Sequence, residues 1–120
     1  MNDAFTPAQQ KLLDRWVELS DEALVEAGHQ SLSAVTRASV AFHAGYLCAL
    51  FLVGPDALSL DVDHPSVKVL RRAAEVAHVD VALGLLYLER RLWDPTAMPS
   101  LSAMLARGHS MRNLASQDRR

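Results

Sequence analysis

The stretch ASVAFHAGYLCALFLVGP, from Ala38 to Pro55, is the strongest indication of the fold, because it runs for eighteen positions without a charged residue. Such a run forms either a membrane span or the most buried helix of a soluble bundle. A span needs about 20 apolar residues to cross roughly 30 Å of hydrocarbon. Here Gly54-Pro55 ends the helix, and Ser39, His43 and Gly45 interrupt its hydrophobicity. We therefore predict a core helix and no interaction with a membrane.

The composition is typical of one soluble globular domain. The chain has 120 residues, of which 50% are hydrophobic and 22% charged, and its net charge is −2. A chain of this length can form a single core without a disulfide or a structural metal. Its only cysteine, Cys48, lies within the uncharged run, and the N-terminus has no signal-peptide pattern. We expect one domain over residues 1–120, located in the cytoplasm.

Apolar periodicity and helix-end signals predict four helices. Thr6-Pro7-Ala8-Gln9 has the spacing of a capping box, which places the first helix start near Pro7. Small residues, including Gly45 and Gly84, recur along the second and third helices and favour close packing between these two. No strand pattern stands out. The predicted fold is all-α, an antiparallel four-helix bundle with helices over residues 7–28, 31–53, 65–93 and 100–116.

Several segments resemble the HEPN domain, a family of all-α bundles. Arg37 to Ala44 (RASVAFHA) is similar to the second helix of that family, and His64-Pro65-Ser66-Val67 to the helix start after its loop. Leu88 to Pro95 resembles the segment in which the following helix ends. Ser39 and Val40 replace the paired tyrosines of the family pattern. The resemblance covers roughly residues 20–115, and it implies a HEPN-like bundle that forms homodimers and works beside a small nucleotidyltransferase partner in toxin–antitoxin pairs.

The same resemblance implies a candidate catalytic pair. Some HEPN proteins cleave RNA without a metal by means of an arginine and a histidine spaced four to six residues apart. Arg72 and His78 have this spacing, and so do Arg37 and His43. In the first pair His78 would act as general acid or base, and Arg72 would bind the phosphate. On a straight helix, residues six apart point about 120° apart, so the pair would need a kink or a dimer partner to meet.

A polar stripe on the second helix is a candidate ligand site. His43 and Tyr46 lie on one face of this apolar helix, and Asp80 has almost only apolar helical neighbours. A buried carboxylate is unfavourable without a partner. We therefore predict that His43 or Tyr46 contacts Asp80 across the helix pair. The competing interpretation is that these polar residues only mark the more solvent-exposed side of the second helix.

A second candidate ligand site surrounds the predicted start of the third helix. His64, Ser66 and Lys68 lie there, where free backbone N–H groups and the helix dipole favour anions such as a nucleotide phosphate. Simple helix capping is the competing interpretation.

Two Glu-x-x-His segments have the spacing that places two metal ligands on one helix face. They are Glu26 to His29 and Glu75 to His78. A di-iron bundle also needs carboxylates from two further helices, and the 31–53 helix has none. We interpret both segments as surface charge pairs, and we expect neither a metal nor a cofactor.

The C-terminal segment is locally basic, with Arg107, Arg112, Arg119 and Arg120. This pattern is typical of a solvated chain end, and RNA contact is the alternative. Taken together, the sequence favours a HEPN-like module that acts by protein, nucleotide or RNA interaction without catalysis. The first alternative is a metal-independent RNase of a toxin–antitoxin pair, which would use Arg72 and His78. The second is a metal-binding helical bundle with Glu75 and His78 as ligands.

Overall fold

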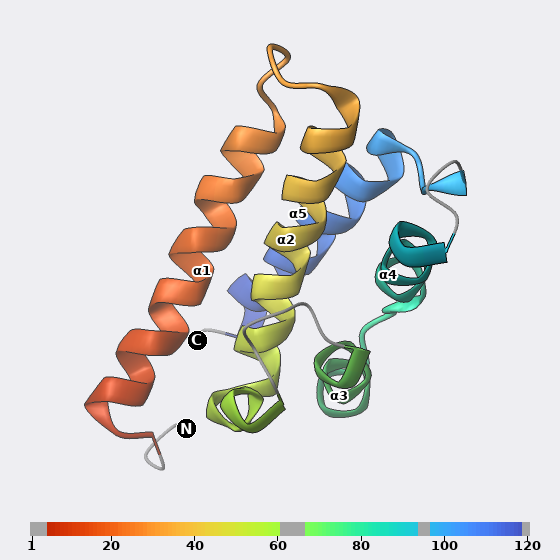
Figure 1. Cartoon of the computed structure of the whole chain (residues 1–120). Helices are drawn as coiled ribbons and strands as arrows, with labels where there is room; N and C mark the ends of the chain where they lie inside the picture. Colours follow the sequence, from red (N-terminus) through yellow and green to blue (C-terminus); the bar gives the residue numbers. More distant parts are fainter. Residues whose placement is uncertain (1–4, 61–66, 94–96, 119–120) are drawn as a thin grey trace.

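A computed structural model describes residues 5–60, 67–93 and 97–118, and these residues contain no strand (Figure 1). The all-α class is therefore confirmed. The elements are α1 (Pro7–Ala27), α2 (Ala34–Val53), the short 3-10 helix η1 (Pro55–Leu60), α3 (Val67–Ala77), α4 (Ala82–Trp93) and α5 (Leu101–Asp118).

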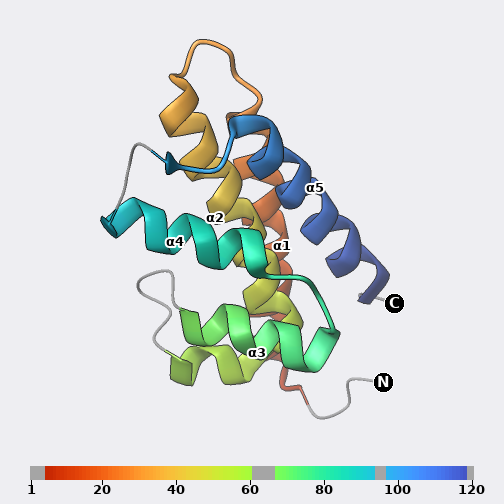
Figure 2. The same cartoon turned by 90° about the vertical axis from the view of Figure 1, so that its right-hand side faces the viewer.

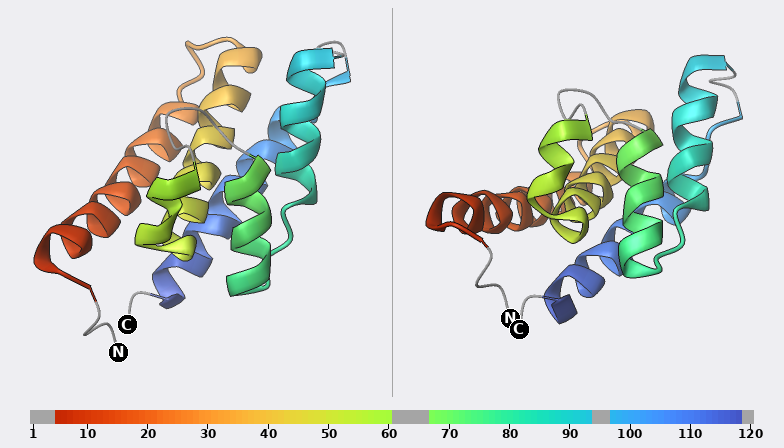
Figure 3. Two further views of the ribbon diagram at one scale, coloured as in Figure 1. Left: turned by 60° about the horizontal axis from the view of Figure 1, so that its bottom comes forward. Right: turned by 90° about the horizontal axis from the view of Figure 1, so that it is seen from below.

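The elements are arranged around α2, which contacts every other one. Helices α1 and α2 form an antiparallel hairpin, and α5 packs against both (Figure 1). Helices α3 and α4 lie side by side and run across α2 (Figures 2 and 3). The contacts of α2 with α1 and α5 are much more extensive than its contacts with α4. The predicted neighbourhood of the second and third helices is correct, but α1 and α5 are the principal partners of α2.

Helix α2 is the buried helix that its sequence predicts. Eleven of its 20 residues are buried, among them Phe42, Tyr46 and Cys48. By length and composition alone it could cross a membrane, since the mean hydropathy of its best window is 1.3. Within the fold, however, 61% of that window is covered by other parts of the chain.

Local signals set both ends of the α1–α2 hairpin. The Thr6 hydroxyl accepts a hydrogen bond from the Gln9 N–H (3.1 Å), and the Gln9 side chain accepts one from the Thr6 N–H (2.9 Å). The predicted capping box is thus confirmed. Helix α2 begins three residues later than predicted, because Ser33 caps it by accepting from the Thr36 N–H. It ends at Gly54, whose φ of 89° is readily adopted only by glycine.

The prediction of one helix over residues 65–93 is wrong, because α3 and α4 are separate helices. Helix α3 ends at Ala77, and His78 takes a left-handed conformation with φ of 56°. Asp80 then caps α4 by accepting from the Ala82 N–H at 2.9 Å. The apolar spacing continues through this break. Periodicity alone therefore could not reveal that the side chain of Asp80 competes with the helix for a backbone N–H.

Candidate functional site

Arg107 in α5 is the only charged residue that is buried among the described residues, with 8% of its surface exposed. The prediction that this arginine belongs to a solvated basic segment is wrong. Met104, Met111 and Ala115, at helical spacing from it, are buried as well. This spacing is the signal in the sequence that would have placed Arg107 on the inner face of α5.

Two glycines make room for the Arg107 guanidinium. A Cβ atom at Gly45 of α2 would overlap its Nη1 atom, and one at Gly84 of α4 would lie 2.6 Å from Nη2. The sequence predicts that these glycines let two helix backbones approach each other. The structure instead places the end of a side chain from a third helix, α5, against both of them.

An aromatic pair forms another wall of this site. The Arg107 Cζ atom lies 5.7 Å from the ring centroid of Phe42. The Phe42 ring stacks on Tyr87 of α4, with centroids 4.5 Å apart and an interplanar angle of 15°. Both aromatic residues are buried. A cation over a desolvated ring gains about 2 kcal/mol, which offsets only part of the unfavourable desolvation of the guanidinium.

The guanidinium has no hydrogen-bond partner, because Nε, Nη1 and Nη2 of Arg107 are all buried and unsatisfied. Burial lowers the pKa of Arg107, while the nearby Cys48 and Asp80 raise it. The ordinary pKa of arginine is so high that the group stays charged. Buried charges are normally paired, and an unsatisfied one calls for an explanation such as a bound ion. Arg107 is therefore a buried positive charge without a hydrogen-bonded counter-ion.

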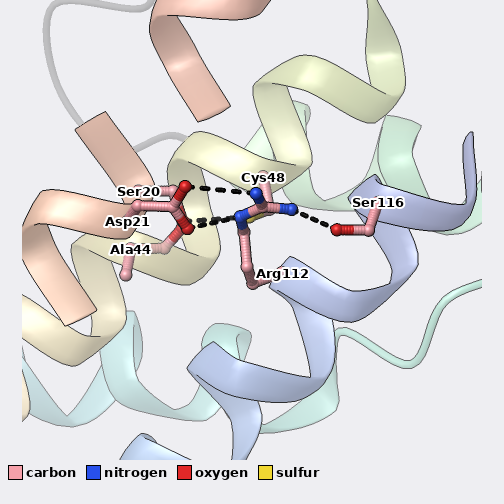
Figure 4. A network of polar contacts seen from close by, with 6 residues as sticks. All are labelled: Ser20, Asp21, Ala44, Cys48, Arg112 and Ser116. Atoms are coloured by element: carbon pink, nitrogen blue, oxygen red, sulfur yellow. Dashed lines mark hydrogen bonds and ion pairs between the residues drawn. The ribbon is translucent and has the colours of Figure 1, made fainter. Parts of the chain in front are cut away.

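Arg112, five residues further along α5, differs from Arg107 because its guanidinium has hydrogen-bond partners (Figure 4). Its Nε and Nη2 atoms lie 2.5 and 3.1 Å from the two carboxylate oxygens of Asp21, and Nη1 donates to Ser116. The hydrogen bond to Asp21 raises the pKa of Arg112. This ion pair ties α5 to α1, whereas Arg107 has no such partner.

A small buried polar contact lies between α1 and α2 beside this ion pair (Figure 4). The Ser20 hydroxyl donates to the Ala44 carbonyl at 3.0 Å and lies 3.1 Å from the Cys48 sulfur. Burial raises the pKa of the Cys48 thiol. The thiol is a packed part of the helix interface and is poorly suited to act as a nucleophile.

The predicted buried contact between Asp80 and the polar stripe is wrong, because Asp80 is exposed. Its carboxylate caps α4 instead of facing the core. Tyr46 is 2% exposed and lies beside Phe42, with ring centroids 6.1 Å apart. His43 lies on the outer side of α2, where partial desolvation lowers its pKa. The helix break before Asp80 is the physical reason for the difference, since it turns this residue from a helix face into a cap.

The other predicted site residues lie on α3 or before it. His64 and Ser66 fall outside the described residues, and Lys68 is exposed in the first turn of α3. Arg72 forms an exposed ion pair with Glu75 (3.1 Å), and His78 is exposed at the helix break. No hydrogen bond joins Arg72 to His78 in the structure, so their catalytic pairing stays a prediction. In the described ranges no three His, Cys, Asp or Glu side chains are grouped to hold a metal ion.

An open groove of about 470 Å³ lies between the end of α1 and α5, lined by Leu24, Val25, Gly28, His29 and His109. Its walls carry no buried polar group. No protein-family profile, curated protein or solved structure matches the chain. The function is therefore argued from the residues of the site itself.

Proposed function

We propose that this chain is a non-catalytic, HEPN-like helical module that binds a phosphate-bearing ligand at Arg107. The observation that carries the proposal is the buried guanidinium of Arg107, whose three nitrogens have no hydrogen-bond partner. A bound anion would supply the missing acceptors and the missing negative charge.

The arrangement around Arg107 lowers the stability of the fold, which favours a functional reason for it. An unsatisfied buried polar group destabilises a protein by about 1–3 kcal/mol, and a charged one by more. Gly45 and Gly84 lie inside helices, where each glycine is less favourable than alanine by about 1 kcal/mol. An apolar side chain at position 107 and alanine at both glycines would avoid these terms. Ligand binding is a direct reason to keep all three residues.

The chemistry of the donor group points to phosphate. The planar fork of a guanidinium donates two parallel hydrogen bonds to a phosphate or carboxylate. A phosphate also agrees with the nucleotide or RNA interaction that the HEPN resemblance implies. Because Gly84 forms one wall, a ligand reaches Arg107 when α4 shifts. This helix contacts the rest of the fold less extensively than α1, α2 and α5 contact one another.

The proposal extends to the setting of the module. We place it in the cytoplasm as a homodimeric four-helix HEPN-like bundle, in which α3 and α4 together take the part of one broken helix. Its protein partner would be a nucleotidyltransferase. Size-exclusion chromatography with light scattering tests the homodimer, and co-purification with the product of a neighbouring nucleotidyltransferase gene tests the partner.

Calorimetric titration with inorganic phosphate and adenosine monophosphate tests the binding site. We expect saturable binding by the wild type and by Arg112→Met, and none by Arg107→Met. Arg112→Met is the matched control, because it removes an arginine from the same helix that is already paired with Asp21. At a ligand concentration of 100 times Kd, binding stabilises the fold by about 2.7 kcal/mol, which a thermal melt resolves. Failure of the wild type to bind, or equal binding by Arg107→Met, would refute the proposal.

A further inference from the structure

The first turn of α4 lies against the unpartnered guanidinium. In this 12-residue helix, Gly84 is the third residue, and Arg107 Nη2 lies 2.6 Å from the position that a Gly84 Cβ would occupy. The N–H groups of a first helical turn have no acceptor within the helix, and the positive end of the dipole lies there. Here the Leu85 N–H donates to the carbonyl of Val81, the residue just before α4, at 3.0 Å, so the N–H groups of residues 82–84 have no acceptor within the helix.

The Asp80 carboxylate is a negative charge next to the first turn of α4. Its carboxylate accepts from the Ala82 N–H at 2.9 Å, and its side chain is exposed. Asp80 is also the carboxylate whose charge raises the pKa of Arg107. It makes no hydrogen bond to the guanidinium, so it balances Arg107 only from a distance. The exposed Asp80 carboxylate thus interacts with two positive groups: it accepts a hydrogen bond at the start of α4, and it attracts the more distant Arg107 guanidinium.

We propose that Asp80 is a resident anion, which a ligand phosphate displaces so that the phosphate bridges the first turn of α4 and Arg107. This inference rests on the proposed function, and it specifies the bound group as a phosphate with nearly two negative charges, either free or as a monoester. At neutral pH such a group carries about −1.5 to −2 charges, against −1 for the Asp80 carboxylate. Exchange of Asp80 for a phosphate monoester therefore gains attraction at this site, whereas exchange for another carboxylate gains little.

Removal of the Asp80 charge should then strengthen binding. In Asp80→Asn the ligand no longer has to displace a resident charge, and the side-chain oxygen of asparagine can still accept from the Ala82 N–H. We expect phosphate affinity to rise by about 3- to 10-fold, as for loss of one like charge at a protein surface. Acetate carries one charge instead of nearly two, so its affinity should rise by a smaller factor, about 2- to 3-fold.

The experiment is a calorimetric titration of the full chain with inorganic phosphate, acetate and adenosine monophosphate at pH 7.5. Glu89→Gln is the matched control, because it removes an exposed negative charge from the same helix, seven residues or about 10 Å beyond Ala82. We expect the control to bind phosphate within about 2-fold of the wild type. Tighter binding of adenosine monophosphate than of phosphate would support a nucleotide as the source of the group, and equal binding would support free phosphate.

The outcomes separate this inference from the proposed function. If the wild type binds phosphate, Arg107→Met does not, and Asp80→Asn binds no more tightly than the wild type, the displacement of Asp80 is refuted while the Arg107 site stands. If the wild type does not bind phosphate or the monophosphate, the proposed function itself fails. Should Asp80→Asn not fold, Asp80→Ser gives the same comparison, because serine caps a helix without a charge.

Discussion

Arg107→Met in phosphate-free buffer should stabilise the protein, which is the reverse of what most core substitutions do. The substitution removes a buried guanidinium whose three nitrogens have no partner and leaves an apolar chain of similar reach. Replacement of buried ionic groups by hydrophobic ones is often stabilising by about 1–4 kcal/mol. Loss of the cation–π contact with Phe42 offsets about 0.5–2 kcal/mol of this gain. The midpoints of these two ranges, about 2.5 and about 1.25 kcal/mol, leave an expected net gain in the free energy of unfolding of about 1 kcal/mol.

Urea unfolding followed by circular dichroism measures this difference, in a buffer without phosphate, sulfate or carboxylate. For a chain of this size, 1 kcal/mol corresponds to about 4 °C in Tm. Arg112→Met is the control, and it should lower the stability by about 0.5 kcal/mol, because it breaks a partly exposed ion pair with Asp21. If Arg107→Met were less stable than the wild type by about 1 kcal/mol or more, the guanidinium would be satisfied in the fold, and the reasoning that assigns it a ligand would be wrong.

Three further predictions concern single residues. Gly45→Ala should abolish phosphate binding in calorimetry, because the new methyl group displaces the flexible end of Arg107. The free energy of unfolding should change by no more than about 1 kcal/mol, because alanine favours the helix. Phosphate binding as tight as in the wild type would contradict the proposed site. The Cys48 thiol should react with a thiol reagent at pH 8 far more slowly in the folded protein than in urea, because burial raises its pKa. Equal reaction rates in the two states would show that the thiol is accessible in the fold. The pKa of His43, measured by NMR, should lie below the ordinary value for histidine, because partial desolvation lowers it. As the pH decreases from about 6.5, the unfolded chain binds a proton at His43 before the folded protein does, so the free energy of unfolding should fall. This fall should be smaller in His43→Gln. The same pH profile in the variant and the wild type would contradict the prediction.

The sequence predicted those parts of the structure that depend on neighbours three or four residues apart. The Thr6 capping box, the Gly54 end of α2 and the bounds of α1 and α5 all follow from such local spacing. The break at His78 escaped this reasoning, because the apolar spacing runs through it and the competing hydrogen bond comes from the Asp80 side chain. The same break explains why the sequence misplaced Asp80 on a buried helix face.

Short-range patterns in the sequence suffice to predict an all-α chain whose uncharged run, as far as Val53, lies in the central buried helix α2, because helix formation and apolar burial depend on neighbours a few residues apart. The environment of the Arg107 guanidinium depends instead on how distant helices pack. Its surroundings come from Gly45 and Gly84, which lie on two other helices and far from it in the chain. Whether a guanidinium ends in water or between helix backbones depends on how those helices pack, and no spacing along one helix contains that information.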